Sequence, residues 1–194
     1  MFENFSRYLC DKADFTTAEL NQIEAVSHTL KIQKDELFVQ EGTVWPYNGF
    51  VCSGLVRSFT IDDYGNECTL HFAPANYWMG DRASLLTGNA MPFSADAIEE
   101  SCLLLIEQKD FHELCKKIET FNILMNTILQ KNIETSQKLI NENISMNEKE
   151  KYVRFLNKYS TVAHRIPHDM VASYVGATPD VLSRIIKSIE TNQG

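Results

Sequence analysis

Residues 165–190 read RIPHDMVASYVGATPDVLSRIIKSIE, and this stretch decides how the whole chain is interpreted. Apolar residues repeat with helical spacing on both sides of Gly176, which predicts two short helices joined at that glycine. Glycine takes the left-handed conformation that ends many helices without a Cβ clash. Thr178 suits the N-cap of the second helix, and Pro179 suits its first position. A small residue at Ala172, a glycine four positions later and apolar residues after it are typical of a helix-turn-helix.

The outer side of the second predicted helix carries groups that suit nucleic acid. Asp180, Ser183, Arg184 and Lys187 lie away from the apolar Leu182 on a helical projection. Such side chains bind base edges and phosphates. The alternative is an ordinary helical hairpin with a solvated polar face. The spacing of the whole motif favours DNA binding over that alternative.

The formal charge is divided unevenly along the chain. The 194 residues together carry −8 at neutral pH. Residues 146–194 contain seven Lys or Arg and five Asp or Glu, a charge of +2, so residues 1–145 carry −10. An acidic body discourages non-specific contact with phosphates, whereas a locally basic module can still bind them. We therefore expect the two parts to have different roles.

The middle of the chain has the pattern of an antiparallel β-structure. Between residues 31 and 107, β-rich runs alternate with glycines and turn residues, and DDYGNE at 62–67 suits a hairpin loop. Short strands at this spacing indicate a barrel or roll. The predicted strands are LFVQEG (37–42), GFVCSG (49–54), LVRSFTI (55–61), ECTLHF (67–72) and CLLLIE (102–107). A helix capped by Thr16 or Thr17 is predicted before them, over residues 14–29.

A long helix is predicted after the β-rich region, because no Gly or Pro occurs between Pro92 and Pro167. The pattern indicates a short helix near 111–118, a long one over 121–143, a linker at 144–149 and a further helix at about 148–159. On a seven-residue frame, Met125, Asn132 and Leu139 share one line of the long helix, and Leu129, Ser136 and Asn143 share the adjacent line. A narrow, partly polar seam is typical of a dimer helix. The alternative is a helix packed only on its own domain.

The composition argues against a membrane or secreted protein. No run of eighteen apolar residues occurs, and the start MFENFSRYLCDKADF lacks the profile of a signal peptide. The five cysteines are scattered and form no CxxC pair. Scattered thiols in odd number indicate reduced cysteines, so we expect a cytoplasmic protein.

With these three parts in this order, the chain resembles the Crp/Fnr family of bacterial transcription regulators over nearly its whole length. The segments that carry the resemblance are LFVQEGT (37–43), GFVCSGLVRSFTIDDYGNECTLHFAPANYWMGD (49–81) and residues 165–190. The resemblance implies an α+β fold with an N-terminal double-stranded β-helix, or β-roll. It implies a cyclic-nucleotide-binding-like sensor at 1–109, a dimerisation helix and linker at 110–145, and a helix-turn-helix DNA-binding domain at 146–194.

The resemblance also implies which residues contact DNA, because the start and outer face of the family's second helix enter the major groove. The corresponding residues here are Thr178, Pro179, Asp180, Ser183, Arg184 and Lys187. Arg184 is the predicted guanine contact, because its guanidinium matches O6 and N7 of that base. Many relatives have an arginine where this chain has Pro179, so the target sequence cannot be copied from them. A C-terminal wing is expected to be short or missing.

The sensor departs from the cyclic AMP site of the family. Family members that bind cyclic AMP have a Gly-Glu pair, which holds the ribose, and then an Arg-Ser or Arg-Ala pair, whose arginine neutralises the phosphate. The matching positions here are Gly80 with Asp81, and Phe93 with Ser94. Phe93 cannot pair with a buried phosphate charge. A cyclic nucleotide is thus a candidate cofactor that the missing arginine argues against, and a different effector, or none, is favoured.

Other residues offer alternatives for the sensor. Arg82 is next to Asp81, Arg57 is on a predicted strand, and Thr135 and Ser136 match the part of the long helix that touches the nucleotide base in relatives. Four residues could line an apolar pocket or simply pack in the core, namely Tyr77, Trp78, Met91 and Phe93. A zinc site at His164 and His168 is disfavoured, because Pro167 separates them and no third ligand is near.

The leading hypothesis is a homodimeric, sequence-specific DNA-binding regulator. Its expected partners are a palindromic double-stranded operator, an unknown small-molecule effector and RNA polymerase. The alternative is a ligand-binding or protein-interaction module with a cyclic-nucleotide-binding-like fold that does not engage DNA. We expect no enzyme and no catalytic or metal-binding residues, because the sequence has no nucleophile elbow, P-loop, HExxH or paired-carboxylate motif.

Overall fold

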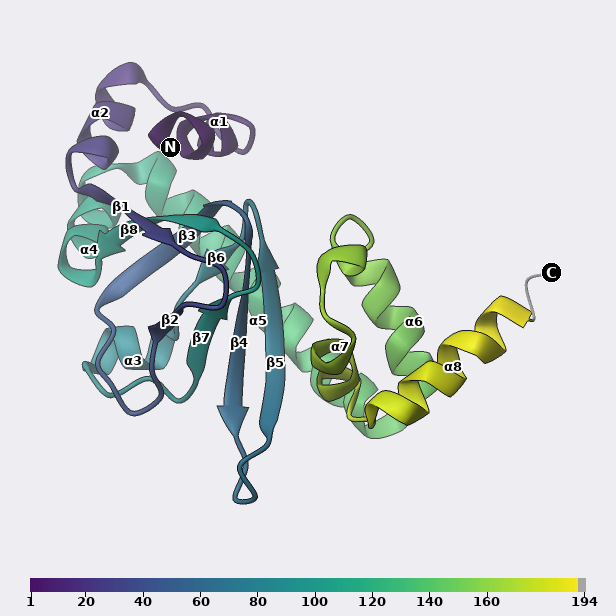
Figure 1. The fold of residues 1–194 in the computed structure, drawn as a ribbon. Coiled ribbons are helices and arrows are strands. Elements are labelled where there is room, and N and C mark those ends of the chain that lie inside the picture. Colours follow the sequence, from purple (N-terminus) through teal and green to yellow (C-terminus); the bar gives the residue numbers. More distant parts are fainter. Residues whose placement is uncertain (192–194) are drawn as a thin grey trace. The chain divides into compact units, whose positions relative to one another are not determined.

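The computed structural model describes residues 1–191, and for residues 140–144 it describes the backbone alone. Asn143, which was assigned to the seam of the long helix, therefore has a side chain outside the described residues. The elements in chain order are α1 (Phe2–Cys10), α2 (Thr17–Ala25), β1 (Ser27–Ile32), β2 (Leu37–Val39), β3 (Tyr47–Ser53), β4 (Leu55–Ile61), β5 (Glu67–Pro74), β6 (Trp78–Met79), α3 (Arg82–Thr87), β7 (Ser94–Ala97), β8 (Ser101–Glu107), α4 (Gln108–Lys117), α5 (Glu119–Ser145), α6 (Glu148–Lys158), a 3-10 turn (Ala163–Arg165), α7 (His168–Val175) and α8 (Pro179–Thr191) (Figure 1).

The chain is divided into two compact units. The first comprises Met1–Thr60 and His71–Gln130, and the second comprises Ile61–Leu70 and the chain from Lys131 onward. The tip of the hairpin between β4 and β5 therefore belongs to the same unit as the C-terminal helices, although both strands begin or end in the first unit.

The first unit is a roll of two four-stranded sheets. Their strand orders are β1-β8-β3-β6 and β2-β7-β4-β5. The pairs β1–β8, β8–β3, β3–β6, β2–β7 and β7–β4 are antiparallel. The predicted double-stranded β-helix is thereby confirmed. Within residues 1–191, no helix combines the length and the apolar composition needed to cross a bilayer.

Strand β8 shows why its sequence is continuously apolar. Alternate residues of a strand point to opposite faces of the sheet. Leu103 and Leu105 pack inside the roll, in a cluster with Val51 and Val56. Leu104 and Ile106 point the other way, into a second cluster formed with helices α1, α2, α4 and α5. Both faces are covered, so neither face of β8 needs polar residues.

The helical part of the second unit is built on α6, α7 and α8, which contact one another in every pairing. Phe155 of α6 and Tyr159 just after it are 1% exposed, and their rings lie 5.4 Å apart. Val171, Ala172, Val175 and Leu182 complete this core. An Asn147 capping box with Glu150 begins α6, so the linker between α5 and α6 is only Met146–Asn147 and shorter than predicted.

Most predicted elements are confirmed, and the errors concern the end of one helix and several short elements. Helix α2 starts at the predicted Thr16 cap but ends at Ala25. Residues 27–29, which were assigned to this helix, begin β1 because they pair with residues 104–106 of β8. Helices α1 and α3 and strands β1, β6 and β7 were not predicted. Strands β6 and β7 have two and four residues, so periodicity gives almost no signal there.

Candidate functional site

The turn between α7 and α8 has the geometry of a helix-turn-helix. Gly176 ends α7 with a φ of 75°, and the N–H of Ala177 donates to the carbonyl of Ala172 at 2.9 Å. Thr178 caps α8, because its hydroxyl accepts the N–H of Val181 at 3.3 Å. Pro167 lies at the N-cap of α7.

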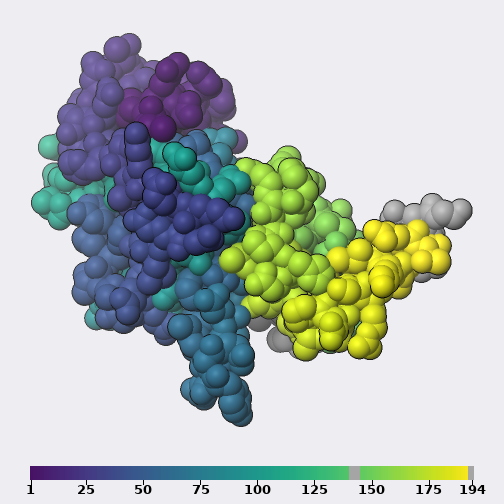
Figure 2. All heavy atoms as spheres, in the orientation of Figure 1, coloured from purple at the N-terminus to yellow at the C-terminus, as the bar shows by residue number. Residues whose placement is uncertain are grey.

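All six residues predicted to contact DNA are exposed, and they lie at the start and on one face of α8. They are Thr178, Pro179, Asp180, Ser183, Arg184 and Lys187. Leu182, between them in sequence, is 0% exposed and packs in the core. Figure 2 shows α8, in yellow, at the surface of the second unit. The helix therefore buries one side and presents cationic and hydrogen-bonding groups on the other.

The hydroxyl of Ser183 is partly committed to its own helix. It donates to the carbonyl of Pro179 at 3.0 Å, which leaves its oxygen lone pairs available. Arg184 and Lys187 lie on the following turn with exposed side chains. These two cations are the groups on α8 best suited to a base edge and a phosphate.

Asp81, which the sequence matched to a ribose-binding glutamate, caps a helix in the structure. The carboxylate of Asp81 accepts the N–H of Ser84 at 2.7 Å and its hydroxyl at 2.8 Å, and so begins α3. Gly80 before it has a φ of 140°, which favours glycine. A Cβ on Gly80 would lie 3.3 Å from Leu85. The carboxylate of Asp81, which was a candidate to bind a ribose, is thus engaged in capping its own helix.

Phe93, which the sequence matched to a phosphate-binding arginine, lies in an apolar cluster. Phe93 packs against Val39, Met91 and Ala95. Ser94 is buried, and its hydroxyl accepts the N–H of Glu41 at 3.0 Å. No compensating cation comes from Arg82, because its side chain is exposed on α3. At Phe93 the roll therefore has an aromatic ring, which cannot neutralise a phosphate.

The four residues considered for one apolar pocket do not meet. Met91 and Phe93 belong to the cluster near β2 and β7, whereas Trp78 packs with the helices outside the roll. Tyr77 packs against the roll interior. The four residues are therefore divided among three apolar clusters, in which they pack as core residues. Thr135 and Ser136 are exposed in the second unit, and the Thr135 hydroxyl donates to the carbonyl of Lys131 at 2.8 Å.

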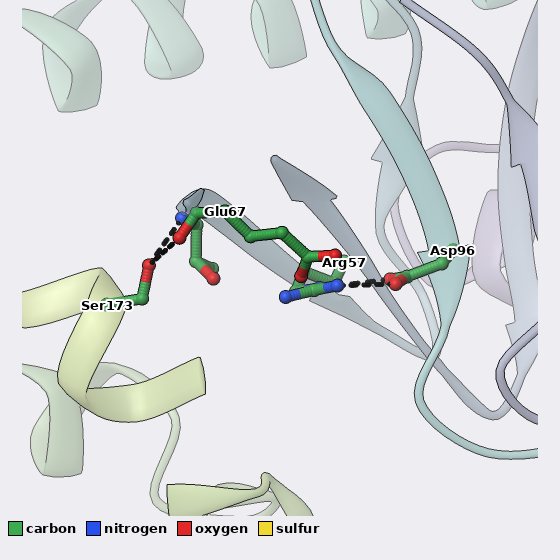
Figure 3. A network of polar contacts seen from close by, with 5 residues as sticks. Arg57, Glu67, Asp96 and Ser173 are labelled. Atoms are coloured by element: carbon green, nitrogen blue, oxygen red, sulfur yellow. Dashed lines mark hydrogen bonds and ion pairs between the residues drawn. The ribbon is translucent and has the colours of Figure 1, made fainter. Parts of the chain in front are cut away.

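Arg57 is the residue whose role the sequence did not reveal. It is 3% exposed, its Nε donates to Asp96 Oδ1 at 3.1 Å and its Nη2 to Asp96 Oδ2 at 2.5 Å (Figure 3). Its neighbour Val56 packs inside the roll, so Arg57 points to the opposite face of the sheet. The guanidinium also lies 4.3 Å from the centroid of the Phe59 ring. An arginine committed in this way cannot replace the missing phosphate ligand inside the roll.

The two buried cysteines of the roll are poor candidates for redox chemistry. Burial, with a smaller contribution from Cys102, raises the pKa of the Cys52 thiol to about 11. Burial also raises the pKa of the Cys102 thiol. Thiolates are the reactive form, so these side chains act as core residues.

Comparison with known proteins agrees with this geometry. Residues 29–118 match the cyclic nucleotide-binding domain family. Among solved structures, the c-di-GMP-responsive global regulator CLP of Xanthomonas campestris is 14% identical, with a TM-score of 0.74 over 92% of this chain and 93% of that one. FixK2 of Bradyrhizobium japonicum is 17% identical, with a TM-score of 0.75 over 87% and 86%. A putative transcriptional regulator of the Crp/Fnr family from Eubacterium rectale is 18% identical, with a TM-score of 0.69 over 92% and 85%.

The comparison with curated protein sequences found no match. The resemblance predicted from the sequence is nevertheless confirmed at the level of fold, because these structures cover about nine-tenths of the chain. The order of roll, long helix and helix-turn-helix is shared over this length.

Proposed function

Because the chain has the fold of the Crp/Fnr regulators, we propose that it is a homodimeric, sequence-specific DNA-binding transcription regulator. The observation that carries the proposal is the outer face of α8. There, six exposed residues lie at the start and on the outer face of the second helix of a helix-turn-helix. The buried side of this helix packs against α6 and α7. In this geometry Arg184 pairs with a guanine and Lys187 with a phosphate.

The dimer is proposed to form along α5, a helix of 27 residues. Its residues 131–138 are all exposed in the single chain, and Ile133 is 50% exposed. Leu129 and Leu139 are half-buried and continue the apolar pattern. A two-fold dimer predicts a palindromic operator with half-sites about one helical turn apart.

We propose that the effector, if the roll binds one, is not cyclic AMP. Three features support this proposal: Phe93 replaces the phosphate ligand, Asp81 caps α3 and Arg57 is held by Asp96. Similar folds are associated with different molecules, since CLP is described as responsive to c-di-GMP and CprK was solved with OCPA. Ligand binding would then bias the α5 interface and the spacing of the two reading helices. We place this non-enzymatic regulator in the cytoplasm, with RNA polymerase as a further partner.

The test is a selection from random double-stranded DNA by the purified protein with no effector added. We expect a single palindromic motif, and we expect the Arg184→Ala/Lys187→Ala double variant to recover none. Enrichment of the same motif by the double variant would remove α8 as the reading helix. If the wild-type protein selects no motif even at low salt, with or without cell extract, the alternative of a ligand-binding or protein-interaction module replaces this proposal.

A further inference from the structure

Helix α7, the first helix of the helix-turn-helix, is joined to the β4–β5 hairpin by one serine side chain. Ser173 Oγ donates to the carbonyl of Glu67 at 2.7 Å and accepts the N–H of Thr69 at 2.9 Å (Figure 3). Strand β5 is at the edge of its sheet, where backbone groups lack a neighbouring strand. A hydroxyl is both donor and acceptor, so Ser173 takes the place of a strand residue at this edge.

The hairpin that Ser173 holds is acidic. Residues 61–70 contain Asp62, Asp63 and Glu67 and no Lys or Arg. A side-chain hydrogen bond from Asn66, with backbone N–H groups, keeps the pKa of Asp62 below its usual value, so this carboxylate stays charged. Asp63 is exposed at the tip. The same unit therefore contains an acidic hairpin and the exposed cations of α8.

We propose that Ser173 and the hairpin form an autoinhibitory latch, which holds the acidic hairpin on α7 of the helix-turn-helix and weakens binding to DNA until the latch opens. The proposal rests on the function proposed above. Carboxylates near a phosphate-binding surface repel the DNA backbone and compete for the same cations. Residues 61–70 continue into β4 and β5 of the first unit, so a change in the sensor can reach the latch along the chain.

The closed state of the latch is held by few interactions, so it can open and close reversibly. It depends on a single side chain, and each of its hydrogen bonds exchanges for one with water when it opens. Among the described residues, the hydroxyl of Thr69 is buried with no hydrogen-bond partner. A buried unsatisfied hydroxyl destabilises the closed state. Opening the latch exposes this group to water and recovers part of that free energy.

The experiment measures the dissociation constant for the selected operator by fluorescence anisotropy, without effector. We expect Ser173→Ala to bind roughly fivefold or more tightly than the wild-type protein, because two hydrogen bonds of the latch are lost. The matched control, Ser160→Ala, makes the same change at an exposed serine of the second unit and leaves affinity unchanged. Amide hydrogen exchange at Thr69 should become faster in Ser173→Ala only, because the Thr69 N–H loses its acceptor.

A second pair of variants tests the charge of the hairpin. Asp63→Asn should tighten binding roughly twofold to threefold at low salt and not at high salt, as expected for an exposed charge. Asp14→Asn removes an exposed carboxylate from the first unit and should have no such effect. Equal or weaker operator binding by Ser173→Ala, with faster exchange at Thr69, overturns the latch and leaves the proposed function intact. If neither wild type nor Ser173→Ala binds any duplex, the proposed function and the latch both fail.

Discussion

Arg184 is the residue on which recognition of one base pair is expected to depend. Its side chain is exposed on α8, on the face opposite the buried Leu182. Arg184→Ala should weaken operator binding by about 1–3 kcal/mol and relax the preference at one guanine, as expected for the loss of a bidentate contact. Lys187→Ala is the control, because a lost phosphate contact weakens binding to all sequences and lowers the salt dependence. Competition binding with operators changed at each position measures both effects.

Lys158 makes stability depend on pH in an unusual direction. Burial, and next the nearby charge of Arg154, lower the pKa of Lys158 to about 8. Below that pH the amine is charged in both the folded and the unfolded state, and burial of this charge destabilises the folded state. Between about pH 8 and the ordinary lysine pKa, the unfolded chain holds more protons, so the contribution of Lys158 to folding stability rises with pH.

The substitution Lys158→Met should therefore stabilise the protein by roughly 1 kcal/mol at pH 7, allowing for solvent screening. The gain should shrink as pH rises above about 8. Urea unfolding of both proteins at pH 7 and pH 10 measures the difference. Lys149→Met changes an exposed lysine at the start of α6 and should show no such pH dependence. A gain that is constant across this range would contradict the proposed burial of the charge.

At the scale of elements, two glycines with similar backbones should respond differently to alanine. Gly176 has a φ of 75° and a Cβ there meets nothing within 4 Å, so Gly176→Ala should cost only the backbone strain, about 1 kcal/mol. Gly54 has a φ of 90°, and its Cβ would lie 2.6 Å from Cα of Ser101. Gly54→Ala should therefore destabilise by roughly 3 kcal/mol or more. Thermal unfolding tests the order, and equal losses would show that the close approach at Gly54 relaxes without strain.

The elements predicted correctly are those whose signals are local. Thr16 and Asn147 start helices through capping boxes, Gly176 ends one, and β4 matches its predicted range of 55–61. Cap and turn chemistry involves neighbours within about four residues, so it is legible in the sequence. Helix α1 was missed because its amphipathic pattern is short, and its place depends on Phe5 and Leu9 packing against the roll.

At the scale of the whole molecule, the state of association should depend on α5. Leu129 lies on the predicted seam and is half-buried in the single chain. Leu129→Glu should convert the dimer to a monomer and lower operator affinity by about tenfold or more, because two half-sites no longer bind together. Lys131→Glu places the same acid two residues away, on another side of the helix, and should remain dimeric. Analytical ultracentrifugation decides between these outcomes, and a dimer with Leu129→Glu would place the interface elsewhere.

The sequence alone determined the order of parts and the helix-turn-helix, and it predicted that Phe93 stands where a phosphate-binding arginine was expected. These features depend on residue spacing, on glycine and proline conformations and on the chemistry of single side chains. Only the tertiary structure decided that Arg57 is held by Asp96, that Met91 and Phe93 lie apart from Trp78, and that Ser173 binds the hairpin. Arg57 and Asp96 are 39 positions apart and Ser173 and Glu67 are 106 apart, so neither contact leaves a local pattern. Such pairings arise from strand register and core packing, which fix side chains in space only after the chain has folded.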